Sequence, residues 1–183
     1  MNPQDLIIQQ TQCWLKTVII GLNFCPFANQ EFKNNTIRYT AFDGVDLESC
    51  LHALAEECQH LDKHPETETT LLIFSHYAEV FDDFLELIDF ANQLLDDLGY
   101  RSTYQLAHFH PQYCFEGEEP DDASNFTNRS PYPTLHLIRE QSMQKAIENY
   151  PDTAEIPDNN IKLARELGAD KLQSLLDECK NKP

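Results

Sequence analysis

Hydrophobic residues recur at helical spacing in several long stretches of the chain. Where apolar side chains return every third or fourth position, one face of the stretch is suited to pack against a core. This pattern predicts five helices, over residues 3–22, 47–61, 79–98, 140–149 and 158–180. Pro26 prevents the first helix from continuing, because proline disfavours helical dihedral angles in the residue before it. Gly168 should break the last helix, with Asp170 capping its second half.

Four shorter segments have the residue types and lengths of β-strands. They cover residues 37–42, 69–75, 102–109 and 134–139. The second contains an unbroken apolar run, which is typical of a strand covered on both faces. Strands and helices alternate along the chain, so we expect an α/β fold with right-handed crossovers and a mostly parallel sheet. Two alternatives stay open: a fourth strand that returns antiparallel beside the third, and a split, ferredoxin-like α+β sheet.

Residues 109–133 form an unusually long connection between the third and fourth predicted strands. Structureless loops longer than about 15 residues are uncommon in compact domains. This loop carries five aromatic residues and four of the ten prolines of the chain. Aromatic side chains can anchor such a segment and prolines restrict it, so we predict an ordered loop. Both of its ends join predicted strands, so it should close over the carboxyl edge of the sheet.

The charge of the chain changes which partners are expected. Lys and Arg total 13 against 31 Asp and Glu, which gives a net charge of −18. So acidic a surface repels phosphate backbones and anionic lipids, so we expect no nucleic-acid or membrane partner. A small-molecule ligand remains compatible with this charge, and the oligomeric state is left open.

Length and cysteine content narrow the class of protein. A chain of 183 residues with 41% hydrophobic residues predicts one folded domain over residues 1–183. The first residues do not resemble a signal peptide, and the apolar runs are too short to span a bilayer. Six cysteines without a Cys-x-x-Cys pair are typical of reduced thiols. These features predict a cytoplasmic protein.

Four of the seven histidines, His76, His108, His110 and His136, suggest a metal or acid–base site. His108 and His110 are two residues apart, so in an extended segment they share a face and can chelate a metal. His76 follows the second predicted strand, and the pair ends the third, at the edge where open α/β sheets bind ligands. His136 would reach this edge from an antiparallel fourth strand. Zinc or iron fits such a site; the alternative is that these are structural histidines.

The polar half of the long loop suggests anion or small-molecule binding. Arg129 is its only cation, and the predicted ligand-binding residues are Tyr113, Asn125, Asn128, Arg129 and Ser130. A guanidinium beside amides and hydroxyls can bind a carboxylate or phosphate of a substrate. We expect Arg129 to face a pocket shared with His108 or His110. Alternatively, it pairs with neighbouring acids and holds the loop to itself.

Cys25 is the candidate nucleophile. It lies in a turn between Phe24 and Pro26. A neighbouring histidine would lower the pKa of its thiol and produce a reactive thiolate. Without such a neighbour, Cys25 is a packing residue, which is the usual role of a buried free cysteine.

Three segments resemble the bacterial "domain of unknown function 1415" family. They are Gly21–Ala28 (GLNFCPFA), Phe109–Phe115 (FHPQYCF) and Asn125–Glu140 (NFTNRSPYPTLHLIRE). The similarity extends over nearly the whole chain. The resemblance implies membership of a family and carries no activity with it.

Three functions are compatible with these patterns. The first is a metal-assisted hydrolase or lyase that acts on a small anionic or polar metabolite, with the metal activating water and Arg129 fixing the substrate. The second is a non-catalytic ligand-binding or scaffold protein with an ordered recognition loop. The third is a thiol enzyme that uses Cys25 and a histidine.

Overall fold

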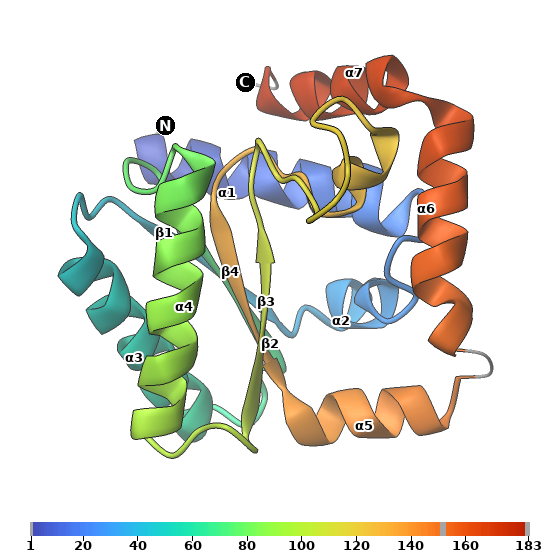
Figure 1. Cartoon of the computed structure of the whole chain (residues 1–183). Helices are drawn as coiled ribbons and strands as arrows, with labels where there is room; N and C mark the ends of the chain where they lie inside the picture. The colour runs from blue at the N-terminus through green and yellow to red at the C-terminus, as the bar shows by residue number, and fades with distance from the viewer. Residues whose placement is uncertain (1, 151–152, 182–183) are drawn as a thin grey trace.

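Four strands form a mixed sheet at the centre of the computed structural model, which describes residues 2–150 and 153–181. They are β1 (Ile37–Phe42), β2 (Thr69–Phe74), β3 (Tyr104–Phe109) and β4 (Thr134–Arg139), in the spatial order β1-β2-β4-β3 (Figure 1). The four predicted strands and the α/β fold are confirmed.

The sheet is less parallel than the sequence predicts. β1 and β2 pair in parallel, whereas β4 lies antiparallel between β2 and β3. The expectation of a mostly parallel sheet is met only in part, because β1, β2 and β3 run in one direction but only one strand pair is parallel. The alternative of an antiparallel fourth strand is confirmed. The chain leaves β3 and enters β4 at the same edge, so β4 has to run back through the sheet. β1, β2 and β3 still end at one common edge, the carboxyl edge.

Two long helices cover one face of the sheet (Figure 1). They are α3 (Leu47–Lys63) and α4 (Phe81–Asp97), and both follow the predicted apolar stripes. Asp46 caps α3, because its Oδ1 accepts a hydrogen bond from the backbone N–H of Ser49 at 2.8 Å. The apolar sides of both helices pack on Leu72 of β2 and Leu135 of β4, which are fully buried.

The opposite face is covered by helices from both ends of the chain (Figure 1). The N-terminal part is α1 (Pro3–Trp14), which continues as the π-helix η1 (Leu15–Ile20), followed by α2 (Ala28–Asn34). The C-terminal part comprises α5 (Glu140–Glu148), η3 (Thr153–Glu155), α6 (Ile156–Leu167) and α7 (Ala169–Lys180). A second core, which includes Trp14, Leu71 and Leu172, joins these helices to the sheet.

Two local features on this face differ from the prediction. The short helix α2 was not predicted, because residues 28–34 lack a continuous apolar stripe. Asp170 does not cap α7, which begins at Ala169, directly after Gly168. Gly168 has a φ of +82°, a left-handed conformation that separates α6 from α7 as expected of a helix-breaking glycine.

The long connection after β3 is an ordered loop, as predicted. It contains a short 3₁₀-helix, η2 (Ala123–Thr127), and lies over the carboxyl edge of the sheet (Figure 1). The indole N–H of Trp14 donates to the carbonyl of Arg129 at 2.9 Å, which ties the loop to α1. Arg165 of α6 forms ion pairs with Glu118 and Asp122 at 2.8 and 3.0 Å. The loop is thus held from two helices.

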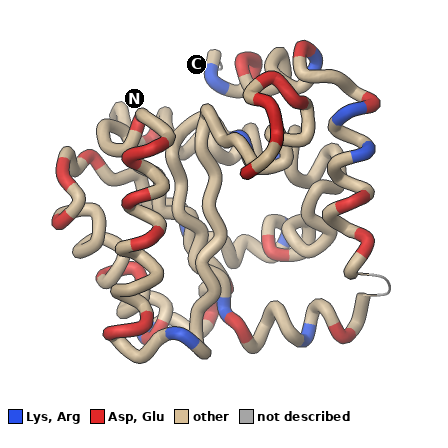
Figure 2. Tube along the Cα trace, in the orientation of Figure 1, with Lys and Arg blue, Asp and Glu red and all other residues tan. Residues whose placement is uncertain are grey.

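Acidic residues dominate the surface of the structure. Figure 2 shows Asp and Glu along α3 and α4 and on the loop after β3, with Lys and Arg fewer in number. Because of this excess of negative charge, an anionic ligand would approach against a repulsive field, and it would need a local group of cations to bind.

None of the described helices is long and apolar enough to cross a membrane.

The π-helix η1 fixes where the chain leaves the first helix. The amide of Gly21 bonds five residues back, to the carbonyl of Lys16 at 3.1 Å, and the amide of Phe24 bonds Ile19 in the same way at 2.9 Å. In this wider turn, a Cβ at position 21 would lie 2.3 Å from the carbonyl oxygen of Thr17. Only glycine therefore fits at position 21, and it sets the path of the segment that follows.

We expect Gly21→Ala to destabilise the protein by about 1–3 kcal/mol, because the added methyl group overlaps a backbone oxygen that the helix holds in place. In an ordinary helix the same substitution is stabilising by up to about 1 kcal/mol. Urea denaturation followed by circular dichroism measures the free energy of unfolding. A variant more stable than the wild type would contradict the role assigned to the π-helix.

Candidate ligand-binding site

The sheet separates two of the four histidines that the sequence predicts to converge. In the ladder between β3 and β4, His108 pairs with Leu135 and His136 pairs with Ala107. Paired residues point to the same face, and successive residues alternate between faces. His108 therefore faces α4, where its ring meets Phe84, whereas His136 lies on the opposite side of the sheet.

His110 is a buried residue that anchors the start of the loop. Its Nε2 donates to the carbonyl of Ala78 at 2.9 Å, and its Nδ1 accepts from the backbone N–H of Gln112 at 3.0 Å. Both ring nitrogens are engaged, and burial lowers the pKa of the ring. His110 therefore has no lone pair to offer a metal. His76, by contrast, is exposed.

The predicted metal centre is not formed by this arrangement. His108 and His110 lie on the same side of the sheet, both against Phe84, but His136 is on the other side. Residues 2–150 and 153–181 contain no group of three or more His, Cys, Asp or Glu side chains that could hold a metal ion. The zinc or iron site expected from His76, His108, His110 and His136 thus lacks its ligand cluster, because the strand register turns His136 away.

Arg129 holds the loop together. Its Nε donates to the carbonyl of Tyr113 at 3.1 Å, and its Nη2 donates to the carbonyl of Pro120 at 2.7 Å. The guanidinium carbon lies 4.4 Å from the ring centroid of Phe126. The largest groups of cavity-lining residues near the loop include neither this guanidinium nor His108 and His110. The geometry matches the alternative, with carbonyls in place of acids as the partners.

Asn125 also has a structural role in the loop. Its side chain is fully buried, where Oδ1 accepts from the backbone N–H of Phe115 at 3.0 Å and Nδ2 donates to the carbonyl of Glu119 at 2.8 Å. In a long loop, many backbone N–H and C=O groups have no partner in a helix or sheet. The buried side-chain amide of Asn125 bonds one group of each kind. Asn125 is therefore not free to contact a ligand.

Of the other predicted ligand-binding residues, Ser130 and Tyr113 contact other parts of the protein, and Asn128 also lines a cavity. The hydroxyl of Ser130 donates to the carbonyl of Tyr132 at 2.6 Å. Tyr113 stacks on His108 with ring centroids 5.6 Å apart. Asn128 donates to the carbonyl of His108 at 3.2 Å, and it also lines a cavity. Of the five predicted residues, Asn128 is the one that the structure places at a cavity wall.

Two adjoining cavities lie on the α1 side of the sheet. The outer cavity, of about 520 Å³, is enclosed by the loop, β3 and α6. The inner cavity, of about 200 Å³, lies between the sheet and the chain from η1 to α2. They share a wall of four residues, Ile19, Cys25, Ala107 and Phe109. This paired cavity is the candidate functional site.

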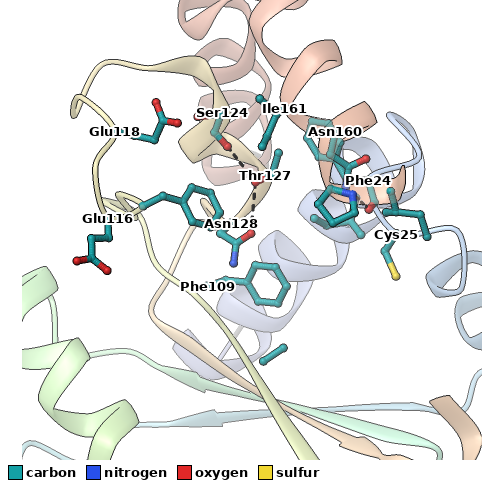
Figure 3. Close-up of a pocket in the computed structure, with 15 residues that line it drawn as sticks. Phe24, Cys25, Phe109, Glu116, Glu118, Ser124, Thr127, Asn128, Asn160 and Ile161 are labelled. Carbon is teal, nitrogen blue, oxygen red and sulfur yellow. Dashed lines mark hydrogen bonds between the residues drawn. The ribbon is translucent and has the colours of Figure 1, made fainter. Parts of the chain in front are cut away.

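The outer cavity has an aromatic interior (Figure 3). Phe24, from the segment after η1, and Phe109, from β3, both line it. The side-chain amide of Asn160 on α6 donates to the carbonyl of Phe24 at 2.7 Å, which fixes the helix against this segment. Figure 3 shows the carboxylates of Glu116 and Glu118 directed away from the aromatic rings. The two carboxylates among the lining residues are therefore directed away from the aromatic interior.

The inner cavity is lined mainly by apolar side chains, among them Trp14, Leu15, Leu71, Ile138 and Met143. Its polar residues turn to protein partners. The hydroxyl of Thr69 donates to the carbonyl of Leu137 at 2.5 Å and lies 2.5 Å from Nε2 of His136. Because a carbonyl only accepts, the Thr69 proton lies on that bond and Nε2 of His136 must be the donor. Burial lowers the pKa of His136 to about 4, so the ring is neutral at pH 7.

Cys25 lies in the wall between the two cavities. Burial raises the pKa of its thiol, and hydrogen bonds from the backbone of Phe27 and Ala28 offset part of this effect. His136 lines the same inner cavity. The structure thus brings Cys25 and one histidine to a common space, but the environment favours the neutral thiol.

Several residues of the site were not predicted from the sequence. Thr69 and Phe27 line the inner cavity, and Pro157 and Asn160 of α6 line the outer one. Periodicity predicted the helix that carries Asn160, but the direction in which it faces depends on how the C-terminal helices return to the sheet. No signal in the sequence carries that information.

We expect Arg129→Met to lower the free energy of unfolding by about 2 kcal/mol, because it removes two hydrogen bonds from a charged group to the carbonyls of Tyr113 and Pro120. Arg165→Met is the matched control, since it deletes exposed ion pairs on the same loop and should cost much less. Urea denaturation of both variants measures the difference. Equal stabilities would show that Arg129 does not hold the loop.

Comparison with known protein families identifies the chain. The three segments singled out by motif meet at the paired cavity, where they contribute Cys25, Phe109 and Asn128. A family model described as "Protein of unknown function (DUF1415)" matches residues 6–174. Searches of curated proteins and of solved structures gave no match. Since the match covers almost the whole chain, the protein belongs to the DUF1415 family.

Proposed function

We propose that this protein binds a small, largely apolar molecule in the outer and inner cavities. The observation that carries the proposal is the wall that the two cavities share, formed by Ile19, Cys25, Ala107 and Phe109. Because the same four side chains line both spaces, one ligand that lies against them can contact both. Concave, mostly apolar sites with a few polar groups are the usual form of small-molecule sites.

The charges around the cavities favour an uncharged ligand. Lys and Arg are absent among the described residues that line either cavity. Arg129 is the cation expected to fix an anionic substrate, but its Nε and Nη2 groups donate hydrogen bonds to loop carbonyls. A carboxylate or phosphate would therefore be desolvated without a partner, which is costly. A neutral molecule loses little hydration free energy when it enters the cavities.

A thiol enzyme is the second candidate function, because Cys25 and His136 line the same cavity. Two features weigh against it. The raised pKa of Cys25 keeps its thiol protonated at pH 7, and a thiol is a much weaker nucleophile than a thiolate. Nε2 of His136 is occupied by Thr69. We therefore favour binding without covalent chemistry.

We expect Cys25 to react slowly with iodoacetamide at pH 7 and to gain reactivity only above pH 8.5, the reference value for a free thiol. The rate should follow the thiolate fraction, which a raised pKa keeps small. Mass spectrometry of the alkylated peptides gives the rate for each cysteine, with the half-buried Cys13 and Cys114 as internal comparisons. Rapid labelling of Cys25 below pH 7 would favour the thiol enzyme instead.

We expect the neutral fluorophore N-phenyl-1-naphthylamine to bind saturably at one site per chain. Ala107 lines both cavities, so Ala107→Leu should fill the shared wall and weaken binding about tenfold or more, the equivalent of roughly 1.4 kcal/mol. Gln105→Leu, two residues away on the same face of β3 but exposed and outside both cavities, is the control. Fluorescence titration measures the three affinities.

Two outcomes would overturn the proposed site. Either the fluorophore gives no saturable binding to the wild type, or Ala107→Leu binds it as tightly as Gln105→Leu does.

A further inference from the structure

A third cavity adjoins the inner cavity on the side away from the loop. It is a groove of about 470 Å³ between α2 and α5, here named the α2–α5 groove, and it is lined by residues that include Phe27, Glu31, Lys145, Ala146 and Tyr150. Phe27 and Glu31 line the inner cavity as well. The inner cavity thus has one neighbour at each end.

One short segment separates the three cavities. Cys25 lines the outer and inner cavities, Pro26 lines the α2–α5 groove, and Phe27 lines both the inner cavity and the groove. Residues 24–27 therefore cross over the inner cavity, with the sheet beneath them. The inner cavity beneath this segment therefore lies between the outer cavity on the loop side and the groove on the α5 side.

The dividing walls consist of side chains. Toward the groove, the divider is Phe27, whose ring meets the edge of Tyr150 at a centroid distance of 5.5 Å, together with Glu31. Toward the outer cavity, Cys25 and Phe109 form most of it. These dividing side chains are half-buried, and a change of rotamer needs no movement of the backbone. Both ends can therefore open to a ligand.

The three spaces differ in polarity along this line. The narrow inner cavity offers apolar side chains, and its polar groups bond within the protein. The outer cavity has Thr127 and Asn128 in its wall, and the groove has Lys145 and Ser142. An occupant that fits this order has an apolar middle and tolerates water or polar groups at its ends.

We propose that the site takes an elongated molecule with an unbranched hydrocarbon chain, which passes beneath residues 24–27 from the outer cavity into the α2–α5 groove. The proposal rests on the proposed function and adds the shape and chemical class of the ligand. A compact molecule of the same hydrophobicity contacts fewer of these three spaces. A chain gains contact in all three, and each buried methylene adds to the affinity.

Neutral primary alkanols from 1-hexanol to 1-dodecanol test the proposal, measured by displacement of N-phenyl-1-naphthylamine from the full-length protein. Affinity should rise about fourfold with each methylene across the whole series, the increment expected for a buried methylene. Ala146→Leu narrows the α2–α5 groove only, so it should weaken 1-dodecanol tenfold or more and leave 1-hexanol unchanged. Gln141→Leu, exposed on the same helix and outside the groove, is the matched control.

A second measurement does not depend on a variant. 1-Dodecanol with a terminal diazirine should crosslink on illumination to residues that line the groove, such as Ala146 of α5 and Tyr150, which follows this helix. An affinity that stops rising at 1-hexanol, or crosslinks confined to the outer cavity, would overturn the elongated ligand and leave the proposed function standing. Failure of every alkanol and of the fluorophore to bind would overturn both.

Discussion

The reversal of the chain between β3 and β4 is the constraint on which the rest of the structure depends. β4 inserts between β2 and β3, so it enters the sheet at the edge where β3 ends. The intervening residues have to remain at that edge, and they cover it. Because the loop then meets α6 and the segment after η1, the space between them becomes the outer cavity. The site is a consequence of strand direction.

A loop of this length needs partners for its backbone, and polar side chains supply them. Arg129, Asn125 and His110 all bond to main-chain groups of the loop or of the segment beside it. Buried peptide groups without partners are costly, so each such side chain offsets part of that cost. Residues whose types suggest metal binding or anion capture therefore serve the architecture. The apolar residues around them are left to form the cavities.

The sequence contains enough information to locate the helices and strands. It contains too little to show to which side of the sheet each side chain points. Apolar spacing located the long helices, and β-forming residue types in short segments located the four strands, because both patterns reflect burial. The fate of the histidines depended on register. His136 pairs with Ala107, and a pairing shifted by one residue would have turned it toward His108. The cavities were out of reach for a related reason: their walls come from η1, β3, the loop and α6, whose relative positions follow from tertiary packing.

The π-helix η1 makes the helical geometry of the N-terminal segment a condition for the binding site. A π-helical turn holds one residue more than an α-helical turn. Each residue of η1 therefore rotates the chain about the helix axis by less than an α-helical residue does. If the residues between Leu15 and Ile20 adopted regular α-helical bonding instead, everything beyond them would rotate by roughly 100° about the helix axis. Cys25 and Phe27 would then leave the cavity walls while the helix itself gained regularity. In this segment, improved local structure and an intact binding site exclude one another.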